Sequence, residues 1–123
     1  MAQGGLPAGQ AGTDLQEVVF VCDATAEKVT AGIYIAGGRP ELGQWQPNLV
    51  RMYDDGTHGD RTAGDGLWSL RVTLPTNAEI QYKYTNSGNP GQWVPSEEFA
   101  GRNRSVMVRR QADPVIVNDV FGR

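Results

Sequence analysis

In the stretch Leu67-Trp-Ser-Leu-Arg-Val-Thr-Leu74, apolar and polar side chains alternate from Trp68 to Leu74. Side chains repeat every two residues along a β-strand, so this pattern predicts a strand with one face in the core. The turn-forming residues Pro75-Thr-Asn77 follow, and the alternation resumes over residues 79–85. The apolar side chains that share the predicted inner faces are Trp68, Leu70, Val72 and Leu74 in the first strand, and Ile80, Tyr82 and Tyr84 in the second.

Short apolar runs of the same kind, each bounded by turn residues, occur along the rest of the chain. They cover residues 18–22, 32–36, 49–53, 105–108 and 115–117. No segment shows the 3.6-residue period of an amphipathic helix, so the sequence predicts an all-β, antiparallel β-sandwich of seven or eight strands. Residues 15–123 are expected to form this one domain, and residues 1–14, rich in Gly, Ala and Gln, a flexible N-terminal arm.

Composition excludes several classes of function. The chain has 123 residues and a formal net charge of −3, with no cluster of basic side chains of the kind that binds nucleic acid. No apolar run approaches the roughly 20 residues that cross a bilayer. The single cysteine, Cys22, lies in a predicted strand, so we expect a buried, unreactive thiol and no intramolecular disulfide. A near-neutral surface suits a neutral ligand.

Two tryptophans lie in predicted loops instead of strands. Trp45 ends the segment Glu41-Leu-Gly-Gln-Trp45, and Trp93 follows Asn89-Pro-Gly-Gln92. Sugars have apolar C–H faces, and proteins bind them from water by stacking flat aromatic rings on those faces and bonding the hydroxyls with a few polar groups. A single loop tryptophan is more often a cap on the end of the core. Two of them, with an outward-facing Lys83 between them in sequence, favour a sugar site.

Several motifs, taken together and in order, resemble the starch-binding domain, carbohydrate-binding module family 20. They are Gly-Ile-Tyr-Ile-Ala-Gly (32–37), Glu-Leu-Gly-Gln-Trp (41–45), Leu-Trp-Ser-Leu-Arg-Val-Thr-Leu-Pro (67–75), Ile-Gln-Tyr-Lys-Tyr (80–84), Trp93 and Asn-Arg-Ser-Val (103–106). Glycogen-binding modules share part of this set. The resemblance implies an immunoglobulin-like sandwich that binds α-1,4-glucans and has no catalytic activity of its own.

The resemblance also implies site residues. The family's main site uses two tryptophans and a lysine, which match Trp45, Trp93 and Lys83, and an asparagine that matches Asn103. The acid that often follows the second tryptophan is replaced here by Val94. The family's second site uses tyrosines from two loops, and no aromatic residue occurs near Val29-Thr30. We therefore expect one main glucan site and an absent or altered second site.

An acidic loop, residues 54–66, departs from the family pattern. It contains Asp54, Asp55, Asp60 and Asp65 among glycines. Carboxylates in such a loop are Ca²⁺ ligands in some proteins, but this spacing is not that of an EF-hand loop. The alternative, which we favour, is that Asp and Gly only form tight turns here, so that the domain has no cofactor. The lone His58 is a weak indication of a transition metal.

Two other classes of function stay open at this point. The sandwich is a structural or protein-interaction domain if Val94 and the altered second site mean that glucan binding has been lost. An enzyme is disfavoured, because a glycosidase needs a spaced pair of carboxylates and none is indicated. For the leading interpretation the expected partners are starch, glycogen, maltooligosaccharides or cyclodextrin, with a monomeric protein. Its compartment follows the parent protein: extracellular with a secreted amylase-type enzyme, cytoplasmic with glycogen.

Overall fold

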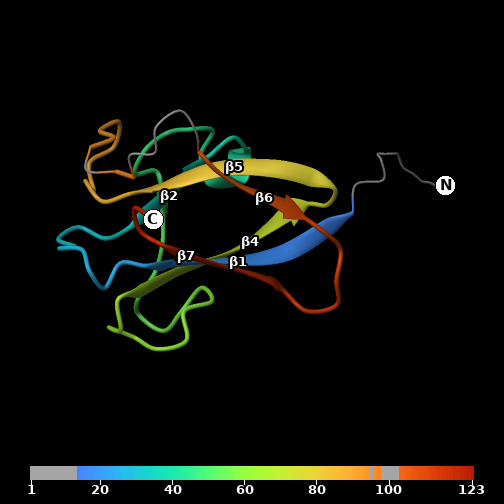
Figure 1. Cartoon of the computed structure of the whole chain (residues 1–123), viewed down its shortest axis with the longest axis horizontal. Coiled ribbons are helices and arrows are strands. Elements are labelled where there is room, and N and C mark those ends of the chain that lie inside the picture. The colour runs from blue at the N-terminus through green and yellow to red at the C-terminus, as the bar shows by residue number, and fades with distance from the viewer. Residues whose placement is uncertain (1–13, 95, 98–102) are drawn as a thin grey trace.

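The computed structural model describes residues 14–94, 96–97 and 103–123, and it is a two-layer β-sandwich (Figure 1). One sheet has the strand order β4-β1-β7 and the other the order β3-β2-β5-β6. No helix among the described residues is long and apolar enough to cross a membrane. The elements are β1 (Leu15–Asp23), β2 (Tyr34–Gly37), the 3₁₀ helix η1 (Pro40–Leu42), β3 (Val50–Arg51), β4 (Leu67–Pro75), β5 (Ala78–Thr85), β6 (Arg104–Val108) and β7 (Val115–Val120).

The core between the layers is built from the alternating side chains that the sequence indicates. Ile80, Tyr82 and Tyr84 of β5 are all at most 2% exposed, and their neighbours Gln81 and Lys83 point outward. The Phe20 ring of β1 packs edge-on against Tyr82 at 4.9 Å between ring centroids. Trp68 packs against this core while staying partly exposed. The predicted sandwich is therefore confirmed, with its inner faces assigned correctly.

Two details differ from the sequence prediction, and a third was not predicted. β1 pairs with β7 in parallel, whereas every other strand pairing of the sandwich runs antiparallel. The second strand begins at Tyr34 and not at Gly32. Val19 points away from the core yet is only 3% exposed, because the acidic loop folds over it. Gly59 of that loop lies so close that a Cβ atom on it would stand 3.0 Å from a Val19 methyl carbon.

A buried ionic network joins the two sheets. Segment 97–104 looks like a polar loop in sequence, but Glu97 is 1% exposed and its carboxylate binds Arg104 at 2.6 Å. Arg104 also reaches Asp119 of β7 at 3.2 Å, and Asp119 accepts hydrogen bonds from the hydroxyls of Tyr82 and Tyr84. Glu97 therefore fixes the chain that follows Trp93 onto the sandwich.

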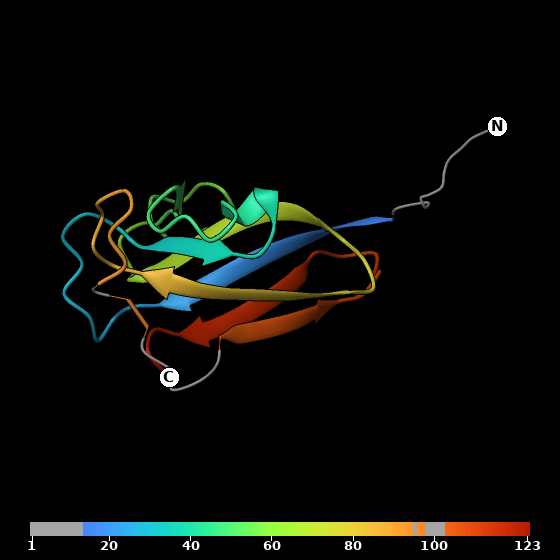
Figure 2. The same cartoon turned by 90° about the horizontal axis from the view of Figure 1, so that it is seen from above.

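The loops that connect the strands gather largely at one end of the molecule. Figure 2 shows the 24–33 loop (cyan) and the 86–92 loop (orange) projecting together at the end opposite the N-terminus. The side-chain amide of Asn86 donates to the carbonyl of Lys28, which joins these two loops. Segment 38–49, which contains η1 and Trp45, lies along the β3-β2-β5-β6 sheet beside them.

Candidate functional site

Trp45 is presented by a tight left-handed turn that follows η1. Gly43, Gln44 and Trp45 all have positive φ angles, of 80°, 50° and 63°. The turn is held by hydrogen bonds from the backbone N–H of Trp45 to the carbonyl of Gly37 and from that of Gln44 to the carbonyl of Arg39. A bulky side chain in this conformation costs about 1–2 kcal/mol. The fold therefore holds the half-exposed Trp45 indole in a strained backbone conformation, which is common at binding sites.

Gly37 allows this turn to sit close to the sheet. A Cβ atom on Gly37 would lie 2.7 Å from the carbonyl oxygen of Gln81 and 2.7 Å from a methyl carbon of Leu42. Any larger residue would push η1 away from β5, and Trp45 would move with it. Glycine at this position is thus a packing requirement of the site, as well as part of the strand.

Trp93 lies beside Lys83. The ammonium nitrogen of Lys83 is 5.1 Å from the centroid of the Trp93 ring, within cation–π range, and both side chains are half-exposed. Lys83 belongs to the outward-facing side of β5, so the charge is anchored on a central strand of the sheet. Val94, which follows Trp93, is 62% exposed.

A residue that the sequence analysis missed, Asn48, joins the loop of Trp45 to the loop of Trp93. Its side chain is 4% exposed, and its amide donates to Ser87 Oγ and to the carbonyls of Asn89 and Gln92. Its carbonyl oxygen accepts from the hydroxyl of Thr85 and the backbone N–H of Gly88. Asn48 has a φ of 60°, a left-handed conformation that asparagine tolerates better than most residues. In the sequence, the only indication of this role was an asparagine that follows proline in Gln46-Pro-Asn48, which is a common turn pattern.

Asn103 approaches the same outer face from the β6 side. It is exposed, and its amide nitrogen lies 3.5 Å from Gln81 Oε1, a long contact. Gln81 is two residues from Lys83 on the same face of β5, so the two side chains are neighbours along the strand. Gln81 also lines a cavity of about 260 Å³ together with Trp45.

The four predicted site residues thus lie on or beside the outer face of the β3-β2-β5-β6 sheet. Lys83 contacts Trp93 directly, Asn103 contacts Gln81, and Gln81 shares a cavity with Trp45. Trp45 and Trp93 are joined through their loops, since the Asn48 amide binds the carbonyl of Gln92 and the N–H of Gly91 binds the carbonyl of Pro47. The arrangement presents aromatic rings, an ammonium group and amides to solvent on one face.

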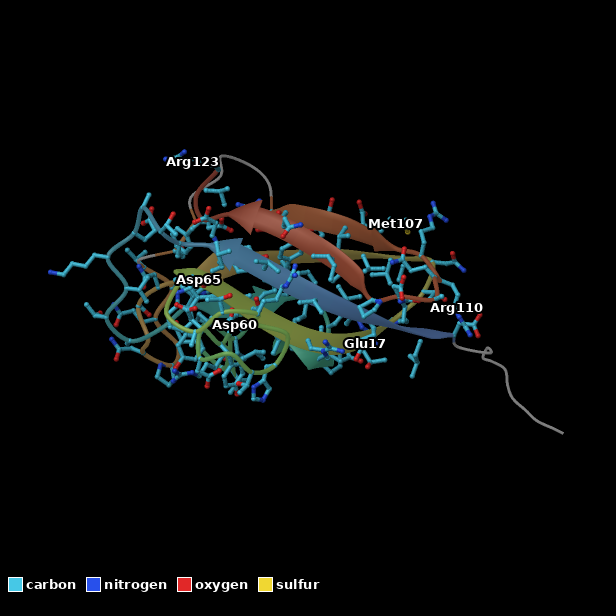
Figure 3. All side chains as sticks on the ribbon, turned by 90° about the horizontal axis from the view of Figure 1, so that it is seen from below. Glu17, Asp60, Asp65, Met107, Arg110 and Arg123 are labelled. Carbon is cyan, nitrogen blue, oxygen red and sulfur yellow. The ribbon has the colours of Figure 1, made fainter. Side chains whose placement is uncertain are left out.

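The acidic loop lies on the other sheet. Figure 3 shows Asp60 and Asp65 in this loop, beside β4. Asp54 accepts from the backbone N–H groups of Asp65 and Gly66, and Asp60 accepts from that of Gly56. The carboxylates of Asp54 and Asp60 therefore hold the turns of this loop by accepting hydrogen bonds from its backbone. Carboxylate oxygens of Asp54, Asp60 and Asp65 also lie within 4.8 Å of one another, and burial followed by the charges of the other two raises the pKa of Asp54.

A larger cavity, of about 500 Å³, lies between this loop and the outer face of the β4-β1-β7 sheet. Its walls are aliphatic and mixed in charge, including Val21, Ile116, Arg71 and Asp65, and contain no aromatic ring. It is larger than the cavity beside Trp45, but it lacks the flat surfaces that stack on sugars. Size alone does not make it the better candidate for a sugar site.

Comparison with known proteins agrees with this geometry. Residues 15–116 match the family described as the starch binding domain. An α-amylase from Streptomyces violaceus is 32% identical over 93 residues, covering 76% of this chain and 14% of the amylase, so the chain spans only a small part of that relative.

Solved structures show the same fold. The family 20 carbohydrate-binding module of a maltotetraose-forming amylase from Pseudomonas saccharophila superposes with a TM-score of 0.58 at 21% identity, covering 85% of this chain and 99% of the module. A γ-cyclodextrin glucanotransferase (γ-CGTase) from an alkalophilic Bacillus clarkii gives 0.64 at 23% identity, covering 89% of this chain and 15% of the enzyme. The family match extends over most of the chain, and the chain therefore belongs to the starch-binding domain family, whose members are non-catalytic modules of β-sandwich fold.

Proposed function

We propose that this starch-binding module holds one stretch of α-1,4-glucan on the outer face of the β3-β2-β5-β6 sheet, by stacking glucose rings on Trp45 and Trp93. Lys83 and Asn103 bond hydroxyls of the stacked sugars. The observation that carries this assignment is the contact of Lys83 with Trp93 on a sheet face to which the loop of Trp45 is tied by Asn48. Starch and related α-glucans are the ligand class.

The interaction is expected to be of moderate strength. A sugar ring lying on an indole removes on the order of 60–80 Å² of apolar surface from water, which at about 25 cal/mol per Å² gives roughly 2 kcal/mol per ring. Two rings and a few exposed hydrogen bonds, less the cost of ordering the sugar, correspond to dissociation constants of about 10 µM to 1 mM. Such values suit a module that holds an enzyme near a polymer.

A single site is proposed, because the acidic loop replaces the segment in which the family's second sugar site would lie. Tyr53, which directly precedes the acidic loop, stacks on His58 with 3.7 Å between the ring centroids. The guanidinium carbon of Arg51 also lies 5.8 Å from the centroid of the Tyr53 ring. One face of this tyrosine is therefore already covered. A one-site module lacks the avidity that a second contact gives on an extended polymer.

Glycogen, maltooligosaccharides and cyclodextrins are proposed as further ligands, because they present the same α-1,4-linked glucose units to a pair of rings. We also propose that the domain acts as a monomer, attached to an enzyme that works on α-glucans. The similarity to a segment of an α-amylase and to part of a cyclodextrin glucanotransferase supports this context.

The test is a pull-down on insoluble starch with the double variant Trp45→Ala/Trp93→Ala. The variant is expected to stay in solution while the parent protein sediments, and His58→Ala, which removes an exposed ring from the acidic loop, serves as the matched control. Retained binding by the double variant would remove the assignment. A parent protein that binds no glucan would support the alternative, a structural or protein-interaction sandwich.

A further inference from the structure

The cavity of about 260 Å³ beside Trp45 has polar walls and a defined position. Its lining residues are Gly38, Arg39, Trp45, Glu79, Ile80 and Gln81. Trp45 is therefore shared between this cavity and the proposed glucan site. The other lining side chains belong to β5 and to the chain between β2 and η1, which are both fixed by the sheet.

Three polar groups at this cavity are available to a ligand. The indole N–H of Trp45 lies at its Gly38 edge, since a Cβ atom on Gly38 would stand 3.2 Å from Trp45 Nε1. Within residues 14–94, 96–97 and 103–123, the structure shows no hydrogen bond from this N–H and no ion pair of Glu79. Among the same described residues, the side-chain amide of Gln81 contacts Asn103 only through its oxygen, and its NH₂ group shows no hydrogen bond there.

The line of β5 sets the direction in which a bound chain would run. Glu79, Gln81 and Lys83 share the outer face of the strand and are spaced by roughly 6.5 Å per two residues. Trp93 lies at the Lys83 end, whereas Trp45 borders the cavity at the level of residues 79–81. A glucan that passes from Trp93 to Trp45 therefore continues over Gln81 toward Glu79.

We propose that this cavity is an additional glucosyl subsite, in which Glu79, Gln81 and the indole N–H of Trp45 bond the hydroxyls of one more glucose unit. The proposal rests on the proposed glucan site. Sugar hydroxyls donate and accept, so a carboxylate, an amide and an indole N–H together match adjacent hydroxyl groups. The hydrogen bonds to the Glu79 carboxylate are charge-assisted and therefore stronger than neutral ones. The subsite supplies polar contacts at the Trp45 end of the site, whereas Val94 offers none from its side chain at the other end.

The consequence is a dependence of affinity on chain length. A short oligosaccharide such as maltotriose satisfies the stacking positions and leaves the cavity empty, whereas maltoheptaose extends into it. In the double variant Glu79→Ala/Gln81→Ala we expect the affinity for maltoheptaose to fall about 5- to 10-fold, which corresponds to roughly 1–1.4 kcal/mol. The affinity for maltotriose should stay within about twofold of the parent value.

The experiment is isothermal titration calorimetry of the parent protein and the double variant with maltotriose, maltopentaose and maltoheptaose. Glu17→Ala is the matched control, because Glu17 is an exposed acid on the opposite sheet whose ion pair with Arg71 is solvent-accessible. Parent and variants are compared by thermal melting, and all three are expected to be equally folded.

The outcomes separate the two proposals. If the parent binds glucans and the double variant matches it at every chain length, the subsite is wrong and the stacking site stands. If the variant weakens all three oligosaccharides equally, Glu79 and Gln81 belong to the stacking positions and the subsite is again wrong. If the parent binds none of the oligosaccharides, both the subsite and the glucan site are overturned.

Discussion

Replacing Asn48 by alanine should both destabilise the fold and weaken glucan binding. The substitution removes every hydrogen bond of the Asn48 side chain, and two groups then lose the only partners that the structure gives them among the described residues: the hydroxyl of Thr85, which is fully buried, and the N–H of Gly88. The buried Thr85 hydroxyl left unsatisfied costs about 1–3 kcal/mol, whereas the half-exposed Gly88 N–H bonds to water instead. Placing alanine at a φ of 60° adds roughly 1 kcal/mol.

The expected total is about 2–4 kcal/mol in the free energy of unfolding, measured by urea denaturation. Asn77→Ala is the matched control, because Asn77 also has a positive φ, of 56°, but is exposed and its side chain forms no hydrogen bond within the described residues. It should cost only the backbone term, about 1 kcal/mol. The difference of roughly 1–3 kcal/mol between the two variants is the contribution of the Asn48 side chain.

Binding should respond separately from stability. Without Asn48 the loop of Trp93 is ordered only when the glucan arrives, and fixing even one residue costs about 1–2 kcal/mol. We therefore expect roughly a tenfold loss of affinity for maltoheptaose, measured by calorimetry at a temperature where the variant is folded. Equal stability of Asn48→Ala and Asn77→Ala, or equal affinity of the two variants for maltoheptaose, would contradict this role of Asn48.

Three further predictions concern the scaffold. Glu97→Gln should lower the free energy of unfolding in urea by about 3 kcal/mol, because it removes the fully buried charge that pairs with Arg104 and leaves Arg104 only the more distant carboxylate of Asp119; a loss below about 1 kcal/mol would contradict the network. Burial raises the pKa of the Cys22 thiol and the Glu97 charge raises it further, so a thiol reagent at pH 8 should modify the protein only after denaturation, and rapid labelling of the native protein would contradict the buried position. The pKa of Asp54 is raised above its usual value of 3.8, so the folded state holds this proton more tightly than the unfolded state and loses stability as pH rises through that pKa. In urea titrations the stability of Asp54→Asn relative to the parent should therefore increase as the pH is raised above 3.8, and a difference that does not change with pH would show that the pKa of Asp54 is not raised.

The inner faces of the strands could be predicted from sequence because their signal is local. Alternation in β4 and β5 identified Leu70, Leu74, Ile80, Tyr82 and Tyr84 as core, and all of them are buried. The parallel pairing of β1 with β7 could not be found this way, because these strands lie about a hundred residues apart and an alternating strand accepts a neighbour in either direction. Val19 shows the same limit, since the loop that covers it is distant in sequence.

The site could be predicted only as far as residue type reveals function. Trp45 and Trp93 stand out as large rings among turn residues, and Lys83 faces outward by strand alternation, but the spatial link between the two loops depends on Asn48. An asparagine after proline is an ordinary turn signal, and nothing in the pattern shows that its side chain is buried between two loops. The cavity beside Trp45 is equally hidden, since Glu79 and Gln81 look like any solvated strand face.

The central claim is that Trp45 and Trp93, and not Trp68, hold the sugar. It is tested most directly by following the three indole N–H resonances by NMR while maltoheptaose is added. We expect the Trp45 and Trp93 signals to move together along one binding curve, while the signal of Trp68, packed against the core, stays in place. A shift confined to Trp68, or no movement of the Trp45 and Trp93 signals during a titration that calorimetry shows to be saturating, would contradict it.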